Sequence, residues 1–394
     1  MFTNFGILLI ILQIFYLISI LLLFPIIIAV FYNLDLIMKK IMILLFIIFN
    51  TALLFSQNDE LMDSIKNNDL NKIKTLLREG ENLDLYNINY GMTPLMYATQ
   101  IGNMDIVKEL LDFGAKDFDF AFYVACGEGY WDIAEEIMKA GASNYNLALS
   151  YAAIGGQLEI VQKLIELGAK DINPALVSAC EGNHLEVVKY LIDNGANVNT
   201  RAYIEAYRNY KGAEKKSPLT AATNIDIIKE LVNVGATNLN DGIIYNAQII
   251  STNFDSTYST CILNEYINLG ADINSFSTND GKTLLMYLIE KRDLDFGLIK
   301  KVIDLGADVN ARDRNGNTVL IRAVMYDYEA PIMDTNLNRK IYRTIGTPLN
   351  IIEELLNAGA DPTERNSYGS TAYRIAAKKK RDDIIKLFDE RTSK

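Results

Sequence analysis

The sequence has 394 residues and a formal net charge of −11. Residues 1–57 sum to +1, so the remainder of the chain carries about −12, which lacks the basic surface that general nucleic-acid binding requires. Three cysteines cannot all pair, and we expect Cys126 and Cys180 to be small core residues rather than members of a disulfide or a metal site.

The first 57 residues are almost wholly apolar and contain two runs. Residues 5–32 are long enough to span a bilayer, whereas residues 41–55 are short for a spanning helix. Lys39 and Lys40 stand between the two runs. Read from Met38, the sequence resembles a bacterial secretory signal peptide, with Ser56 as the expected last residue before cleavage.

Two interpretations of this segment remain open. In the first, translation starts at Met38 and residues 1–37 are not part of the protein. In the second, both runs are membrane helices joined by a turn at Lys39-Lys40, which the positive-inside rule places in the cytoplasm. Both predict that residues 58–394 lie outside the cytoplasm, either periplasmic or secreted, or membrane-anchored through the N-terminal segment unless that segment is cleaved.

Residues 58–80 predict a helix pair that begins the second region, and residues 91–115 predict a second pair with clear start and stop signals. Thr93 is expected to cap a helix, and Pro94 suits its first position because the missing N–H has no partner there anyway. Gly102 and Gly114 are expected to end the two helices in the left-handed conformation. The second helix carries an apolar stripe at helical spacing, at Ile106, Val107, Leu110 and Leu111.

The ending Gly-Ala recurs along the chain and marks a repeat. It begins at Gly114, Gly141, Gly168, Gly195, Gly235, Gly270, Gly306 and Gly359. Within the first four of these units, one position holds Gly102, Gly129, Gly156 and Asn183, all residues that tolerate a left-handed backbone. Another holds Ala98, Ala125, Ala152 and Ala179, small residues suited to stacking between inner helices. Such self-similarity predicts a solenoid, in which each unit is buried only by its neighbours.

The unit resembles an ankyrin repeat, because residues 91–98 read G-x-T-P-L-x-x-A and a D-I-V and an L-L-x-x-G-A motif follow. The resemblance covers residues 59 to 394 and implies an all-α fold: an ankyrin solenoid of about ten helix pairs with short β-hairpin loops, called fingers. Three compact units over residues 116–196 predict trimmed fingers. Full or enlarged fingers are expected at residues 86–93, 200–216, 277–283 and 312–318. An insertion at residues 330–346 is expected between an inner and an outer helix, on the edge opposite the fingers.

Membership of this family implies a non-enzymatic module that binds another protein through its finger tips and its concave helix face. Finger candidates for contact are Tyr90, Met92, Arg201, Tyr207, Arg208, Tyr210, Lys211, Asn279, Lys282, Arg314 and Asn317. The enlarged finger at residues 200–216 is the most distinctive, because tyrosine alternates with basic residues there, a composition enriched at binding hot spots. Tyr97, Tyr151 and Ser178 share one inner-helix position and are expected to line the concave groove.

The sequence indicates no catalytic site, cofactor or metal site. His184 is the only histidine and stands where ankyrin repeats commonly place one before the outer helix, so a multi-histidine metal site is excluded. Two alternatives remain. One is an enzyme or toxin with a site in the insertion, at Asp334, Arg339, Lys340, Tyr342 and Arg343. The other is a subunit of a membrane complex whose repeats only mediate assembly.

Overall fold

A computed structural model describes residues 59–87, 89–204, 214–252, 256–290, 296–334, 339–346 and 348–392. The apolar segment 1–57 lies outside the described residues, as do Tyr207, Arg208, Tyr210 and Lys211. In the part of the chain that is described, no helix combines the length and the apolar character that crossing a bilayer requires.

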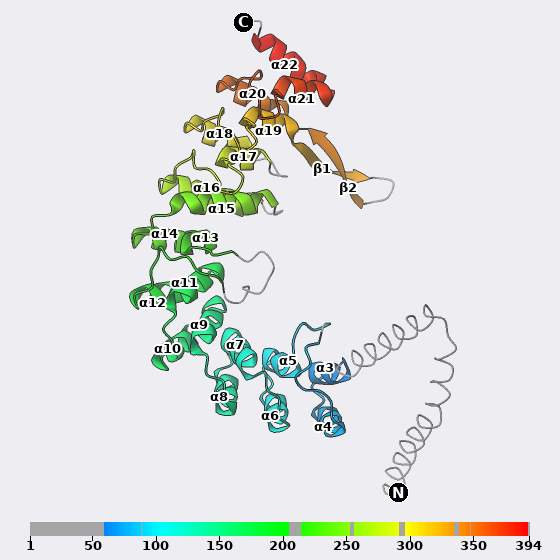
Figure 1. The fold of residues 1–394 in the computed structure, drawn as a ribbon, viewed down its shortest axis with the longest axis vertical. Coiled ribbons are helices and arrows are strands. Elements are labelled where there is room, and N and C mark those ends of the chain that lie inside the picture. The colour runs from blue at the N-terminus through cyan, green and yellow to red at the C-terminus, as the bar shows by residue number, and fades with distance from the viewer. Residues whose placement is uncertain are drawn as a thin grey trace, which may run out of the picture. The chain divides into compact units, whose positions relative to one another are not determined.

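The chain divides into two compact units, where the sequence predicts one repeat domain from residue 58 onwards. The first unit ends at Asp117, and its described helices are α3 (Asp59–Lys66), α4 (Leu70–Glu79), α5 (Pro94–Ile101) and α6 (Met104–Asp112). Helix α3 packs against α4 and α5, and α4 and α5 pack against α6. These helices therefore form two successive helix pairs (Figure 1).

The second unit begins at Phe118 and continues as a stack of helix pairs (Figure 1). Its inner helices are α7 (Phe118–Glu128), α9 (Tyr145–Ile154), α11 (Ile172–Glu181), α13 (Pro218–Ala221), α15 (Leu239–Thr252), α17 (Leu284–Ile289), α19 (Val319–Met325) and α21 (Ala372–Lys378). Its outer helices are α8 (Trp131–Ala140), α10 (Leu158–Glu166), α12 (Leu185–Asp193), α14 (Ile225–Asn233), α16 (Ser256–Asn268), α18 (Phe296–Asp304), α20 (Leu349–Asn357) and α22 (Asp382–Thr392). Each inner helix packs against the next inner helix and against its own outer helix. Over the described residues, α3 to α22 thus form ten helix pairs.

The predicted helix signals are confirmed where the structure describes them. Thr93 accepts a hydrogen bond from the backbone N–H of Met96 at the start of α5, and Pro94 is the first residue of that helix. Gly102 has a φ of 77°, and Asn183 takes the same left-handed conformation with a φ of 61°. Backbone geometry therefore explains why Asn183 can replace the glycine that the other three repeats have at this position.

The core of the stack has one recurring pattern. The outer helices from α8 to α20 each bury two adjacent apolar residues and a third one turn later, as at Ile160, Val161 and Leu164 in α10. Inner helices bury large residues too, but at the predicted stacking position they bury small ones, and Ala125, Ala152 and Ala179 are fully buried. The predicted stacking position is therefore a core position, because alanine lets neighbouring inner helices approach closely.

Inner helices α7, α9 and α11 come closest at three glycines near their C-terminal ends. A Cβ added at Gly155 would lie 2.0 Å from the carbonyl oxygen of Gly127. A Cβ added at Gly182 would lie 2.3 Å from the carbonyl oxygen of Ile154. This part of the stack holds the compact units, and a side chain at Gly155 or Gly182 would clash with the adjacent repeat, whereas one at Gly127 would be tightly packed.

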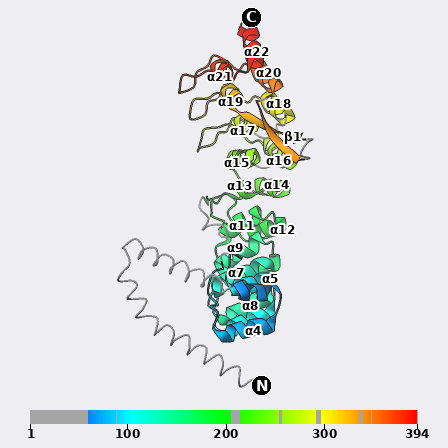
Figure 2. The ribbon, with the colours of Figure 1, turned by 90° about the vertical axis from the view of Figure 1, so that its right-hand side faces the viewer.

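The fingers follow the sequence prediction. Isolated β-bridges close the four fingers predicted to be full or enlarged, pairing Asn87 with Met92, Ala202 with Lys216, Phe276 with Thr283 and Arg312 with Thr318. Residues 116–196 are all described and contain no such bridge, as expected for trimmed fingers. The loops that precede α17, α19 and α21 lie side by side (Figure 2).

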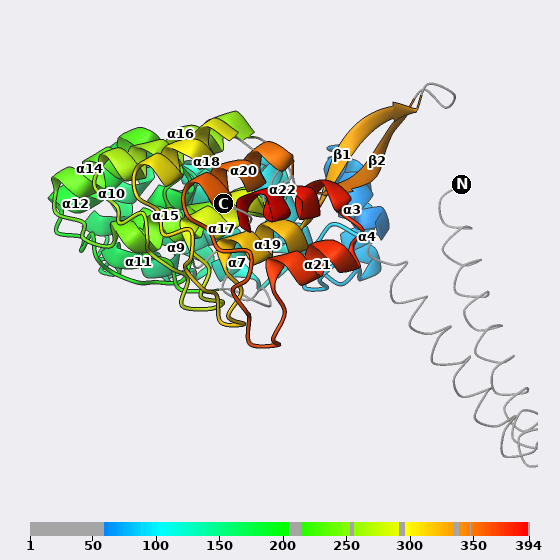
Figure 3. The same cartoon turned by 90° about the horizontal axis from the view of Figure 1, so that it is seen from above.

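The predicted insertion contains two strands, an element that the all-α prediction did not include. β1 (Asp327–Asp334) pairs antiparallel with β2 (Arg339–Gly346), and the hairpin stands between α19 and α20. It leaves the stack on the side away from the finger loops, which extend downward in Figure 3. The predicted location between an inner and an outer helix is therefore confirmed.

Candidate binding surface

Three neighbouring fingers of the second unit form a continuous surface, which we call the finger layer (residues 272–283, 308–318 and 361–370). The backbone N–H of Arg314 donates to the carbonyl oxygen of Asp280 at 3.0 Å, and that of Ser367 donates to Asn315 at 3.0 Å. The chain turns back at the tip of each finger through a glycine with a φ of 70–73°, namely Gly281, Gly316 and Gly369. A side chain at Gly281 or Gly316 would meet the backbone of the next finger, so glycine also permits the close approach.

A buried polar network holds the finger layer to the inner helices. The side chain of Asp313 is fully buried and accepts a hydrogen bond from Arg322 Nε on α19 at 2.7 Å. The other side of the same guanidinium contacts Glu290, with 2.9 Å between Arg322 Nη1 and Glu290 Oε1. Lys282 Nζ lies 2.7 Å from the second oxygen of Glu290. Opposite charges thus alternate across two fingers and two helices.

The network continues toward α15 through the neutral side chains of Tyr287 and Gln248. Tyr287 donates its hydroxyl hydrogen to Asp280 Oδ1 at 2.7 Å, and Gln248 Nε2 lies 2.8 Å from the same hydroxyl oxygen. Burial raises the pKa of Tyr287. Burial acts in the same direction on Asp280, but hydrogen bonds from Tyr287 and from the backbone of Lys282 outweigh it and hold the pKa of this carboxyl below its usual value. Asp280 therefore stays ionised at neutral pH and anchors the finger.

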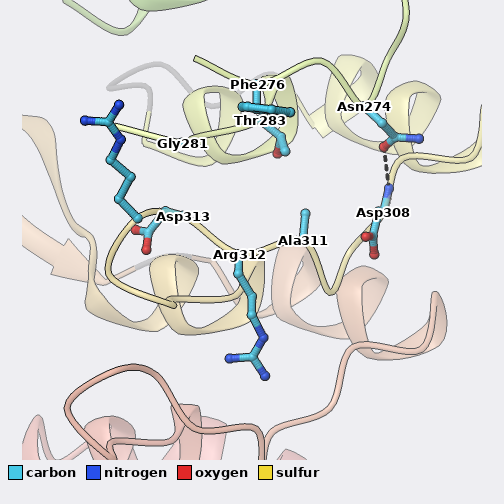
Figure 4. Close-up of a pocket in the computed structure, with 9 residues that line it drawn as sticks. Asn274, Phe276, Gly281, Thr283, Asp308, Ala311, Arg312 and Asp313 are labelled. Atoms are coloured by element: carbon cyan, nitrogen blue, oxygen red, sulfur yellow. Dashed lines mark hydrogen bonds between the residues drawn. The ribbon is translucent and has the colours of Figure 1, made fainter. Parts of the chain in front are cut away.

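The outer side of the finger layer carries exposed aromatic and cationic groups. Phe276 is 65% exposed and Tyr368 is 75% exposed, the two highest values among the exposed large hydrophobic side chains of the described residues. Phe276 and Thr283 line one wall of a pocket of about 380 Å³, and Ala311 and Asp308 line the other (Figure 4). Arg312 points away from Phe276 and pairs with Glu364 of the next finger. Arg314 is exposed beside this pocket.

Four predicted contact residues belong to the finger layer, and they differ in accessibility. The side chains of Asn279 and Arg314 are exposed. Lys282 is half-buried in its contacts with Glu290 and Asp280, and Asn317 is buried. Because Asn317 bonds to Asp313 and Asn366, it supports the fingers from within and offers a partner no accessible side chain.

The first unit holds Tyr90, Met92 and Tyr97, all half-buried. The rings of Tyr90 and Tyr97 lie 4.9 Å apart between centroids. The Tyr90 hydroxyl donates to Asp63 Oδ1 at 2.5 Å, and this hydrogen bond raises the pKa of Tyr90 to about 12. The pair is thus a local aromatic patch at the base of the first finger.

Tyr151 belongs to a second aromatic group, which the sequence did not reveal. Its ring lies 5.5 Å from that of Tyr123 on α7, and Phe120 lies 5.7 Å from Tyr123 on the same helix. Phe120 is exposed, whereas burial raises the pKa of Tyr123 to about 12. The expected groove does not extend to Ser178, because that residue is buried.

The described part of the enlarged finger is its base. Arg201 is exposed and lies 3.6 Å from Asp241, a contact that solvent weakens. Lys216 is more constrained, since its Nζ lies 2.6 Å from Glu181 and 5.0 Å from the centre of the Tyr245 ring. Burial acts to lower the pKa of Lys216, but the contacts with Glu181 and Tyr245 outweigh it and the pKa is raised. The base of this finger is thus fixed by Lys216.

The histidine and two of the cysteines lie at packing positions between or within the repeats. His184 Nε2 lies 3.0 Å from the carbonyl oxygen of Ile154, so the imidazole bridges adjacent repeats. Cys126 and Cys180 are buried thiols, as predicted for core residues. In the described ranges, no group of three or more histidine, cysteine or acidic residues is placed to hold a metal ion.

Comparisons with known proteins agree with this architecture. Residues 61–148, 122–202 and 149–242 each match the family model of ankyrin repeats (3 copies). A stretch of 60 residues is 38% identical to the "Ankyrin repeat, SAM and basic leucine zipper domain-containing protein 1" of Mus musculus. That stretch is 15% of this chain and 12% of the mouse protein, so the two are similar over a small part of either.

Proposed function

Because residues 61–242 contain ankyrin repeats, we propose that this chain is a non-enzymatic protein-binding module and that the finger layer is its main contact surface. Ankyrin repeats suggest a scaffold for protein–protein interaction, and the family is typically non-enzymatic. The choice of surface rests on one observation. The finger layer presents exposed Phe276, Tyr368 and Arg314 on a framework fixed by the Asp313–Arg322 pair.

Ordered fingers bind a partner at a lower entropic cost than flexible loops do. A flexible loop loses conformational entropy when it docks, whereas fingers joined by main-chain hydrogen bonds have lost most of it already. Aromatic and arginine side chains supply large contact areas and are enriched at hot spots. Phe276 is exposed at a pocket that Arg314 also lines, and a partner side chain that fills this pocket would contact both an aromatic ring and a guanidinium.

Site-specific photo-crosslinking tests this assignment. A photoreactive phenylalanine analogue placed at Phe276 or Tyr368 should crosslink a partner in the native cell. The same analogue at Leu167 or Leu305, exposed residues that follow outer helices α10 and α18, should not. Equal crosslinking from both pairs, or from the outer pair alone, would place the partner elsewhere.

We propose the enlarged finger at residues 200–216 as a second contact region, because its composition is rich in tyrosine and in basic residues.

We also propose that the repeats lie outside the cytoplasm, because apolar runs flank Lys39-Lys40. A phosphatase reporter that is active only outside the cytoplasm, fused after Lys394, should be active. An inactive phosphatase together with an active cytoplasmic reporter would overturn this location.

A further inference from the structure

The hairpin of β1 and β2 carries opposite charges on its two strands. β1 contains three acidic and no basic residues in eight positions. β2 contains Arg339, Lys340 and Arg343 and no acidic residue. In a chain with a net charge of −11, this strand is a local concentration of positive charge. Salt screens charges beyond about 8–10 Å, so a ligand beside β2 would experience the strand more than the distant acidic surface.

Among the residues that the structure describes, each strand has one edge without a strand partner. The sheet contains β1 and β2 alone among the described residues, so the outer N–H and C=O groups of β2 pair with no described strand. A sheet of two strands is at best marginally stable in water, and an open edge is a template for a further strand. Pro331 lies on β1 and lacks an N–H, which makes β1 the poorer template.

We propose that the open edge of β2 accepts an extended, acidic segment of a partner protein as a third strand. Main-chain hydrogen bonds to β2 would supply affinity, and carboxylates beside Arg339, Lys340 and Arg343 would supply specificity. This surface is separate from the finger layer, and the proposal does not depend on the function proposed for that layer.

Charge selects this occupant over a second copy of the chain. Two β2 strands placed side by side would bring arginine and lysine against arginine and lysine, which destabilises neighbouring strands. Pairing β2 with β1 of another copy would match the charges, but it would use the edge that contains Pro331 and would form an open-ended chain of molecules. A partner strand with carboxylates avoids both problems.

The register defines a suitable peptide probe. Ile332 pairs with Ile341, and Asp334 pairs with Arg339, so Arg339, Ile341, Arg343 and Ile345 occupy alternate positions on one face of the hairpin. The probe is an eight-residue peptide in which glutamate and valine alternate on one face and threonine fills the other. Its matched control replaces the glutamates by lysines.

Hydrogen exchange followed by NMR on the full chain gives the decisive readout. The glutamate peptide should bind at least tenfold more tightly than the lysine peptide and should slow exchange at alternate amides of residues 339–346. A variant with Arg339→Glu, Lys340→Glu and Arg343→Glu should reverse this preference. A variant with Lys108→Glu, Lys116→Glu and Lys170→Glu changes the net charge equally at exposed positions and should retain it.

Three results would overturn the proposal. One is equal binding of both peptides by the unaltered chain. A second is protection confined to residues 276–283, which would move the peptide to the finger layer and leave the function proposed for that layer standing. The third is protection of β2 that rises with protein concentration in the absence of peptide, which would identify a second copy as the occupant.

Discussion

Arg322 Nε lies 2.7 Å from Oδ2 of Asp313, whose side chain is fully buried. Asp313 also accepts hydrogen bonds from the backbone N–H groups of Asn315 and Asn317 at 2.8 Å. Asn317 Nδ2 is a fourth donor, at 2.9 Å, and replacing Asp313 by alanine would leave all four without this acceptor. Because removing one member of a buried ion pair is strongly destabilising, Asp313→Ala should cost about 3–5 kcal/mol in the free energy of unfolding measured in urea.

The same fingers supply a control for this prediction. Glu364 pairs with Arg312, and both side chains are more than 40% exposed. Glu364→Ala should therefore cost less than about 1 kcal/mol, since exposed ion pairs contribute little. Equal costs for the two variants would show that the network around Asp313 does not hold the fingers.

Gly155→Ala should destabilise the second unit. Its new Cβ would lie 2.0 Å from the carbonyl oxygen of Gly127, so α7 and α9 would have to move apart. Overpacking of this kind costs about 1–3 kcal/mol. Gly127→Ala is the milder comparison, because its added Cβ would lie 3.3 Å from the carbonyl oxygen of Tyr151, a contact that a small shift relieves. Calorimetry should show a lower melting temperature for the first variant, and an unchanged one would contradict this close packing.

Leu110 and Leu164 are fully buried on outer helices of different units. Replacing either by alanine should cost about 2–5 kcal/mol. Since repeats are stabilised by their neighbours, the Leu110→Ala loss should appear mainly in the melting of the first unit and the Leu164→Ala loss mainly in that of the second. Leu167→Ala serves as a control, because that side chain is 46% exposed. A cost below half a kilocalorie for Leu110→Ala or Leu164→Ala would contradict the burial.

The three cysteines should react at different rates. Burial raises the pKa of the Cys126 and Cys180 thiols, so neither is ionised at neutral pH, and both are inaccessible. Cys261 is exposed on α16. Iodoacetamide at neutral pH should therefore alkylate Cys261 alone in the folded protein and all three cysteines in denaturant, as counted by mass spectrometry. Rapid native modification of Cys126 would contradict its place in the core.

Sequence reasoning located the repeats because their signals are local. Thr93, Gly102 and Asn183 each satisfy a backbone requirement that can be read without knowing any neighbour. The bridges at Phe276–Thr283 and Arg312–Thr318 follow in the same way from the turn residues Asp280-Gly281 and Asn315-Gly316.

Long-range contacts account for what the sequence did not reveal. Gly127, Gly155 and Gly182 matter because of the backbone of the adjacent repeat, which no local pattern reports. Lys282 and Asn317 have the polarity of contact residues, but Glu290 and Asn366 from other segments engage them. Phe276 could have been predicted as a contact residue, because it is an aromatic residue in a polar finger. Ala311, which lines the same pocket, has no sequence feature that sets it apart.

The most direct test of the account is the affinity of the finger layer for its partner. A partner crosslinked at Phe276 would be purified and titrated calorimetrically against the unaltered chain and against a variant with Phe276→Ala and Arg314→Ala. We predict at least tenfold weaker binding, about 1.4 kcal/mol, with a melting temperature that moves little. Lys170→Ala, an exposed change outside the finger layer, should leave the affinity unaltered. Unchanged affinity in the double variant, or a loss that appears only as the protein unfolds, would contradict the claim that the finger layer binds the partner.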